Sequence, residues 1–209
     1  MKERPMIFNA EMVRAILDGR KTQTRRPVNP QPELTAGSGF SWNGHLHGAG
    51  SNERETNRNF SHVACPHGKP GDRIWVREAY RVHSKATDLA TLVYRASVQN
   101  SWTEQTRRVP VDVCNKPVSP EKWTPSIHMP RWASRITLEI TGVRVERLHA
   151  ISEADARTEG VTAGVCPGHE QVMHRVAFRE LWQSLYNAEN WQANPWVWVV
   201  EFERVEGAA

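Results

Sequence analysis

The stretch Gly19-Arg20-Lys21-Thr22-Gln23-Thr24-Arg25-Arg26-Pro27 decides how this chain is interpreted. It follows residues 12–17, whose apolar side chains recur at the spacing of one helix face. Gly19 is the expected helix stop, because glycine enters the left-handed region without steric cost. Residues 22–25 have strand character, which Pro27 ends because proline cannot donate to a ladder. The segment therefore places a lysine, threonines and arginines where a helix gives way to a strand, which suits anion binding or activation of a hydroxyl.

Lys21 and Thr24 are the first candidates for chemistry. A threonine hydroxyl is a poor nucleophile unless a nearby base removes its proton. A lysine can be that base when burial or a cationic neighbour lowers its pKa. Residues three apart on a regular strand face opposite sides, so the two side chains meet only if Lys21 lies in the preceding turn or curls over. The alternative is a surface lysine beside ordinary strand threonines.

Glu159 is the second candidate. It ends a short expected helix that begins with a capping-box pattern at Ser152 and Asp155 and stops at Gly160. A carboxylate there meets the unfavourable negative end of the helix dipole, which indicates either a site residue or a surface glutamate. Next to Lys21 it would raise the lysine pKa and oppose a base role, unless desolvation dominates or Glu159 contacts the substrate instead.

Three stretches in this order resemble the ASCH domain family of the PUA-like superfamily, most closely its stand-alone, phage- and prophage-encoded members. They are residues 5–27, the turn Lys69-Pro70-Gly71-Asp72, and residues 151–161. The resemblance is weakest over 30–64 and 83–122. It implies an α+β fold, a PUA-like β-barrel with flanking helices and long insertion loops.

The same resemblance implies an activity. ASCH members that hydrolyse N4-acetylcytidine carry a catalytic lysine, threonine and glutamate, which match Lys21, Thr24 and Glu159 here. Thr24 would attack the acetyl carbonyl, Lys21 would take its proton, and Glu159 would orient Lys21 or bind the base. Arg20 and Arg26 are the expected substrate-binding arginines. This chain is about twice as long as those enzymes, with insertions at 30–68 and 83–130, so the resemblance implies the reaction and leaves the substrate open.

Composition favours a soluble globular protein of one domain over residues 1–209, with a mild basic excess. The 209 residues carry a net charge of +4 and are 39% hydrophobic, enough to bury roughly 70% of the unfolded surface. Clustered arginines around Lys21 favour a polyanion partner, and a solvated basic face is the alternative. No stretch suits a membrane span or a signal peptide, so we expect a cytoplasmic protein with reduced cysteines.

Residues 122–135 form a third candidate region. Two prolines fix the backbone, while tryptophans, His128 and arginines alternate around them. Aromatic faces beside guanidinium groups suit an unstacked base and its phosphate. Trp132, Arg135 and then His128 are the expected substrate-binding residues, and the alternative is a rigid loop whose tryptophans plug one end of the barrel.

We expect no bound metal. The one set that could form a zinc site is Cys65, His67, Cys166 and His169, provided that two distant loops converge, with Cys114 as a possible substitute. Ordinary buried or surface thiols are the competing interpretation. No Walker, Rossmann, HExxH or GxSxG pattern occurs, and no cofactor is expected.

The remaining sequence is divided by periodicity and turn residues. Residues 29–68 show no period, and residues 97–125 are irregular and partly polar, so both are predicted insertion loops. The other predicted elements are strands at 5–8, 73–82, 91–96, 136–148 and 195–202, and helices at 9–18 and 171–186. The last strand is apolar on both faces and is therefore expected to be central.

These features predict an amidohydrolase that acts on a nucleoside or single-stranded RNA and removes an acyl group from a modified base. Two rivals stay open. One is a non-catalytic RNA-binding module that uses the same basic surface, and the other is a ribonuclease.

Overall fold

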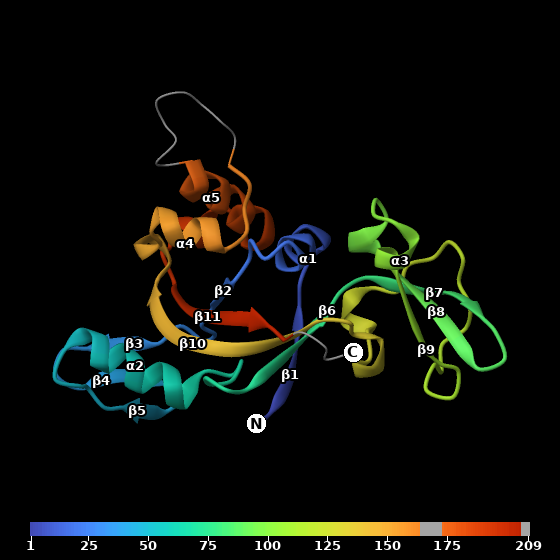
Figure 1. Ribbon diagram of the computed structural model, residues 1–209. Helices are drawn as coiled ribbons and strands as arrows, with labels where there is room; N and C mark the ends of the chain where they lie inside the picture. Colours follow the sequence, from blue (N-terminus) through green and yellow to red (C-terminus); the bar gives the residue numbers. More distant parts are fainter. Residues whose placement is uncertain (164–172, 206–209) are drawn as a thin grey trace. The chain divides into compact units, whose positions relative to one another are not determined.

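The computed structural model describes residues 1–163 and 173–205 (Figure 1). The chain forms two compact units, each assembled from separate segments. The first comprises Met1–Asp18, Arg73–Glu139 and the C-terminal residues from Arg204, and the second comprises Gly19–Asp72 and Ile140–Glu203. The units are described one at a time below. The prediction of a single domain stays a prediction.

The predicted mixed α+β class is confirmed. The strands are β1 (Glu3–Ile7), β2 (Gln23–Pro27), β3 (Glu33–Thr35), β4 (Gly39–Trp42), β5 (His45–His47), β6 (Arg73–Arg77), β7 (Tyr80–Lys85), β8 (Leu89–Tyr94), β9 (Thr106–Pro110), β10 (Thr137–Arg147) and β11 (Trp196–Arg204). The α-helices are α1 (Ala10–Leu17), α2 (Glu53–Ala64), α3 (Trp102–Gln105), α4 (Glu153–Thr158), α5 (Met173–Tyr186) and α6 (Ala188–Gln192). Short 3₁₀ turns are η1 (Arg95–Ser97), η2 (Ser126–His128), η3 (Arg131–Ala133) and η4 (Leu148–Ala150).

None of the sheets closes into a barrel within residues 1–163 and 173–205. In the same residues, no helix combines the length and the hydropathy that a membrane crossing requires.

The first unit contains two groups of paired strands. β1 pairs in parallel with β6, and the first residues of β10 pair antiparallel with β6. β7, β8 and β9 form a separate antiparallel sheet. One face of this sheet packs on a buried cluster that includes Tyr80, Leu92 and Met129. The predicted strand at 73–82 is in fact two strands, because the pairing partners change between β6 and β7.

Local signals around α1 are confirmed. The side chain of Asn9 accepts a hydrogen bond from the backbone N–H of Met12, which satisfies one of the free donors at the start of the helix. Gly19 follows the helix with φ of +73°, a conformation that favours glycine.

The second unit is built on β11, which lies between β10 and β2 as its apolar sequence predicts. Its side chains alternate between two buried clusters. Val197 and Val199 pack with residues of α4 and α5, including Trp182. Trp196 and Trp198 pack on the other face with Phe40 and Phe60. Figure 1 shows α4 and α5 on one side of β11, and β3, β4, β5 and α2 on the other.

The prediction of a structureless loop at 29–68 is wrong. This segment contains the three-stranded sheet β3-β4-β5 and the helix α2. The rings of Phe40 and Phe60 stack with centroids 4.5 Å apart, and Phe40 meets the edge of Trp196 at 5.0 Å. A few aromatic residues thus hold this segment in place. The glycines, serines and asparagines between them leave no helix or strand periodicity in its sequence.

Residues 97–125 are also more ordered than predicted, since they include α3 and β9. The helix predicted at 171–186 is present from Met173, and its first two positions lie outside the described residues. The capping box of Ser152 and Asp155 is confirmed, and Gly160 ends α4 with φ of +84°.

Candidate active site

Lys21 lies in the short segment between Gly19 and β2, and this segment is tied to the end of α4. Lys21 forms an isolated antiparallel bridge with Glu159. The N–H of Thr22 donates to the carbonyl of Thr158 at 2.9 Å, and the carbonyl of Thr22 accepts from the N–H of Phe202 at 2.8 Å. The backbone therefore fixes Lys21 between the last turn of α4 and strand β11.

The Lys21 amine is bound twice by Glu159. Its Nζ lies 2.8 Å from the carbonyl oxygen of Glu159 and 2.8 Å from the carboxylate Oε2. The side chains of Lys21 and Glu159 are 0% and 2% exposed, so the pair is shielded from water. The structure thus brings together two residues that are 138 positions apart in the sequence.

Burial lowers the pKa of Lys21, and this is the largest influence on its protonation. The carboxylate of Glu159 opposes that shift by attraction and by hydrogen bonding, whereas the positive charges of Arg26 and Arg25 add to it. The sequence left open whether desolvation or the carboxylate would dominate. The lowered pKa indicates that desolvation does.

Arg25 binds the other oxygen of Glu159. Its NH1 donates to Oε1 at 3.0 Å, and its Nε and NH2 donate to Oε1 of Glu146 at 3.1 and 2.6 Å. The guanidinium also lies 5.8 Å from the centre of the Phe178 ring. Both carboxylate oxygens of Glu159 are therefore held, one by Lys21 and one by Arg25, which fixes the orientation of the carboxylate.

An outer set of charges extends this network. Arg144 pairs with Glu146 at 3.1 Å, with Asp155 at 3.0 Å and with Glu201. The side-chain amide of Gln23 donates to the carbonyl of Asp155 at 2.7 Å. The exposure of these groups increases outward, from the fully buried Arg25 to Glu201 at 46%. The network therefore connects the buried pair with the surface of the second unit.

Thr24 stands apart from this network. It pairs with Val200 of β11 in the antiparallel register, while Arg25 pairs with Val199. Side chains alternate along a strand, so Thr24 points to the face opposite that of Gln23 and Arg25. Thr24 is 2% exposed, and within the described part of the chain no hydrogen bond joins its hydroxyl to the Lys21 amine. Of the three predicted catalytic residues, Lys21 and Glu159 are hydrogen-bonded to each other and Thr24 is bonded to neither.

Sequence reasoning missed the residues that complete the network. Arg25 entered only as a nearby positive charge, and Glu146, Asp155 and Arg144 were not considered as site residues. One signal was present, because Arg144 and Glu146 are two apart on a strand and so share a face. Nothing in the sequence showed that this face would meet Arg25.

The two arginines predicted to bind substrate have different environments. Arg20 is exposed, and its NH1 donates to the carbonyl of Gly160 at 2.9 Å, directly after Glu159. Arg26 is half-buried and pairs with Trp198 in the register of β11, on the same strand face as Thr24. Arg20 is thus adjacent in sequence to Lys21, whereas Arg26 lies on the same face of β2 as Thr24.

His128, Trp132 and Arg135 belong to the first unit. Trp132 is partly buried against the core, with its ring 6.3 Å from that of Tyr80 in an edge-on arrangement. Arg135 chelates both oxygens of the buried Glu78 at 2.9 and 3.1 Å. His128 is exposed.

Two further hydrogen bonds hold Arg135. NH2 donates to the hydroxyl of Ser97 at 2.9 Å, NH1 donates to the carbonyl of Glu104 at 3.1 Å, and the guanidinium lies 4.1 Å from the centre of the Tyr94 ring. The predicted substrate-binding arginine is thus committed to partners within the protein.

The possible zinc set is only partly visible. Cys65 and His67 are partly exposed after the end of α2, and Cys166 and His169 lie outside the described residues. Cys114 is buried in the apolar cluster of the first unit. In residues 1–163 and 173–205, no group of three or more histidine, cysteine, aspartate or glutamate side chains is arranged to hold a metal ion.

Comparison of the chain with family models, with curated proteins and with solved structures found no match.

Proposed function

We propose that this chain is an ASCH-type protein of PUA-like fold that hydrolyses an amide on a modified base, with Lys21 as the general base and Glu159 as its partner. The substrate class is an N4-acylated cytosine, in a nucleoside or in single-stranded RNA. The proposal rests on one observation. A fully buried lysine with a lowered pKa is held by two hydrogen bonds to a single glutamate, which is itself fixed by Arg25.

The hydrogen bonds of Lys21 are compatible with a base. A neutral amine has two N–H groups and one lone pair. The two N–H groups match the two acceptors that Glu159 offers, its carbonyl oxygen and Oε2. The lone pair is then left over, since no other hydrogen bond reaches this nitrogen from the part of the chain that the structure describes. Lys21 can accept a proton there, and the resulting ammonium is stabilised by the adjacent carboxylate.

The proposed reaction is acyl transfer in two steps. The Lys21 lone pair takes the proton of the Thr24 hydroxyl while Oγ1 attacks the acetyl carbonyl carbon. The carbon–N4 bond then breaks, N4 takes the proton from Lys21, and cytidine leaves. Water then attacks the acyl ester while Lys21 takes one of its protons, the bond from the acyl carbon to Oγ1 breaks, and Oγ1 takes that proton from Lys21 as acetate leaves. General-base assistance of this kind contributes roughly 10²–10⁴-fold to rate.

Thr24 is the part of the proposal that needs a change in geometry. It lies on the opposite strand face and is not hydrogen-bonded to Lys21. Its hydroxyl can reach the Lys21 amine only if this part of β2 rearranges when substrate binds. Water activated directly by Lys21 is the competing nucleophile, and it would leave Thr24 as a structural residue. Replacement of Thr24 separates the two.

The deciding experiment measures acetate release from N4-acetylcytidine. Lys21→Met should lower it by roughly 10²–10⁴-fold, the contribution of a general base, and Glu159→Gln should lower it as well. Met keeps the length of the buried stem, and Gln keeps the shape of the carboxylate without its charge. Lys69→Met, an exposed lysine of the same unit, is the matched control. Loss with Thr24→Ala and retention with Thr24→Ser supports the threonine, whereas activity in Thr24→Ala supports water. No acetate release from the unaltered protein, with either nucleoside or acetylated RNA, refutes the proposal.

The same preparation distinguishes the rival functions. Incubation with unmodified single-stranded RNA yields fragments if the chain is a ribonuclease. Binding that weakens with salt and yields neither acetate nor fragments is the result expected of a non-catalytic module.

A further inference from the structure

The outer face of the sheet β7-β8-β9 in the first unit has no part in the amide chemistry proposed above. Its opposite face packs on the core through Tyr80, Val82 and Leu92. Side chains alternate along each strand, so the residues between these core positions point to the outer face. The register places Arg81 opposite Val93, and Thr91 opposite Arg108, which assigns all four to the outer face. Val93 is buried there, Arg81 and Thr91 are partly exposed, and Arg108 is exposed.

Two tryptophans flank this face. Trp102 of α3 is 52% exposed, and its ring contacts His83 with centroids 5.0 Å apart. Trp123 lies beside the outer edge of β7, where the neighbouring Thr124 pairs with Tyr80. The guanidinium of Arg81 lies 5.3 Å from the centre of the Trp123 ring. Both tryptophans are therefore in contact with residues of β7.

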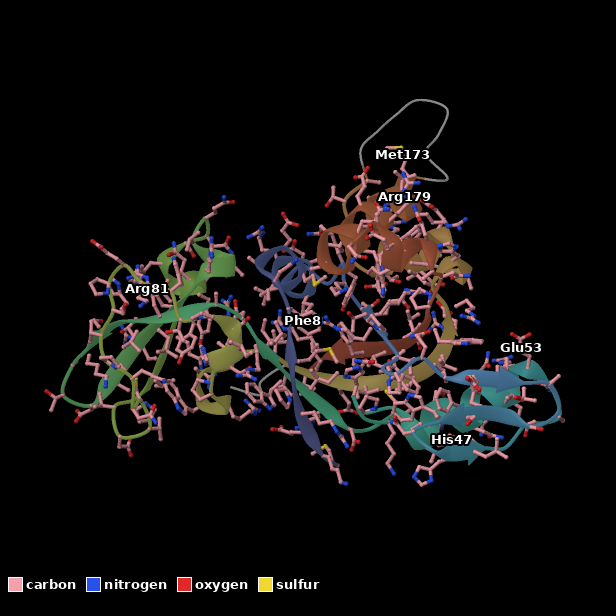
Figure 2. The ribbon with its side chains drawn as sticks, turned by 180° about the vertical axis from the view of Figure 1, so that it is seen from behind. Phe8, His47, Glu53, Arg81, Met173 and Arg179 are labelled. Atoms are coloured by element: carbon pink, nitrogen blue, oxygen red, sulfur yellow. The ribbon has the colours of Figure 1, made fainter. Side chains whose placement is uncertain are left out.

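The polar side chains on this face differ in how far they are fixed. Arg81 donates to the carbonyls of Ser119 and Pro120, so it is positioned before any ligand binds. Arg108 is exposed and has no partner in the described part of the chain. Nδ1 of His83 is buried and lacks a hydrogen-bond partner among the described residues, although a buried polar atom normally has one. Figure 2 shows Arg81 among the side chains of this sheet.

The dimensions favour an extended ligand. Neighbouring strands lie about 4.8 Å apart, so β7 and β9 are separated by roughly 10 Å with β8 between them. Arg81 and Arg108 are also offset along the strands by two register positions, which is about 7 Å. A chain with repeated charges can contact both arginines without either side chain bending toward the other.

We propose that this face binds single-stranded nucleic acid. Bases stack on Trp102 and Trp123, and phosphates contact Arg81 and Arg108. Aromatic rings beside basic side chains on a sheet are suited to unpaired bases, because every base has a flat face and every nucleotide a negative charge. The residues differ from those of the proposed amidohydrolase site, and binding needs no turnover, so each proposal can fail without the other.

The test is fluorescence polarisation with labelled 12-nucleotide RNA, DNA of the same sequence and duplex RNA, at 50 and 200 mM salt. Trp102→Ala should weaken single-strand binding by about fivefold to a hundredfold, the range of one lost stacking contact. Trp102→Phe should retain most of the affinity. Arg108→Ala should weaken binding and reduce the slope of log affinity against log salt by about 0.7, the value for one phosphate contact on a single strand. Tighter binding of RNA than of DNA assigns RNA as the ligand, and equal binding assigns single strands of either kind.

Arg95→Ala is the matched control, since Arg95 is an exposed arginine of the same unit in η1 and not in the sheet. It should bind as the unaltered protein does. The proposal is overturned if no single strand binds at 50 mM salt, if duplex RNA binds as tightly as single strands, or if Arg95→Ala weakens binding as much as Arg108→Ala. Circular dichroism of each variant verifies the fold, and the exposure of Trp102 and Arg108 makes unfolding an unexpected result.

Discussion

Each unit buries a basic side chain against a glutamate, Lys21 with Glu159 in the second unit and Arg135 with Glu78 in the first, and these two pairs differ in what they can do. Lys21 and Glu159 in the second unit are 0% and 2% exposed, and Arg135 and Glu78 in the first are 12% and 2% exposed. In both pairs a carboxylate is removed from water and held by at least two hydrogen bonds. Burial raises the pKa of Glu78 against the opposing influence of Arg135, and it lowers the pKa of Lys21 against that of Glu159.

The difference is in the cation. A guanidinium stays charged in proteins, and that of Arg135 is engaged by Glu78, Ser97 and Glu104. It can fix neighbouring segments but cannot exchange a proton. A lysine amine with a lowered pKa can lose its proton and take it back. The buried pair of Arg135 and Glu78 in the first unit therefore has a structural role, whereas that of Lys21 and Glu159 in the second unit is suited to proton transfer.

The largest expected effect is on turnover by Lys21→Met. If Lys21 is the base, kcat/KM for N4-acetylcytidine should fall by roughly 10²–10⁴-fold, the contribution of a general base. Arg135→Met should lower the amount of folded protein instead of the rate per folded molecule. The contrast is measured as acetate release normalised to the folded fraction. An equal normalised loss in both variants would contradict the distinction between the two pairs.

The next effect is on stability. Glu78→Gln should lower the free energy of unfolding by about 3–5 kcal/mol, because the buried guanidinium of Arg135 loses its only carboxylate partner among the described residues. Urea unfolding measures this change. Glu139→Gln is the control, since Glu139 and Arg73 are 3.7 Å apart and 38% and 28% exposed, and should change stability by less than about 1 kcal/mol. An equal decrease in the free energy of unfolding for Glu78→Gln and Glu139→Gln would show that Glu78 and Arg135 do not act as a buried pair.

The pH dependence of turnover tests the lowered pKa of Lys21. Only the neutral amine is a base, so kcat/KM should rise with pH as Lys21 loses its proton and level off below the ordinary lysine value of 10.5. Stability should rise in the same interval, because the unfolded chain binds a proton at this position that the folded protein has already released. Lys21→Met should remove this increase in stability. A pH–rate profile that is still rising at pH 10.5 would contradict the assigned pKa direction.

The smallest effect is expected at the outer end of the network. Glu201→Gln should lower the free energy of unfolding by less than about 1 kcal/mol, because Glu201 is 46% exposed and Arg144 keeps Glu146 and Asp155. Glu146→Gln should cost more, since it removes a partner of the fully buried Arg25. Urea unfolding of the two variants measures the difference between their losses in free energy of unfolding. A larger loss with Glu201→Gln would show that the stabilisation does not increase toward Lys21.

Much of the fold was predictable from short-range patterns. The cap at Asn9, the left-handed Gly19 and the capping box at Ser152 depend on a few consecutive residues, and all three are confirmed. The prediction at 29–68 is wrong because the core of that segment consists of isolated aromatic residues. Phe40 and Phe60 stack on each other across twenty positions, a relation that no local period expresses.

The sequence by itself determined that Lys21 follows a helix stop, that Glu159 ends a capped helix and that β11 is buried on both faces. Those properties depend on backbone conformation and on apolar composition, which neighbouring residues set. The tertiary structure alone decided that Lys21 meets Glu159, that Arg25 shares the carboxylate and that Thr24 faces the other way. These contacts depend on which strands pair and in which register, and a shift of one residue would exchange every side chain between the two faces.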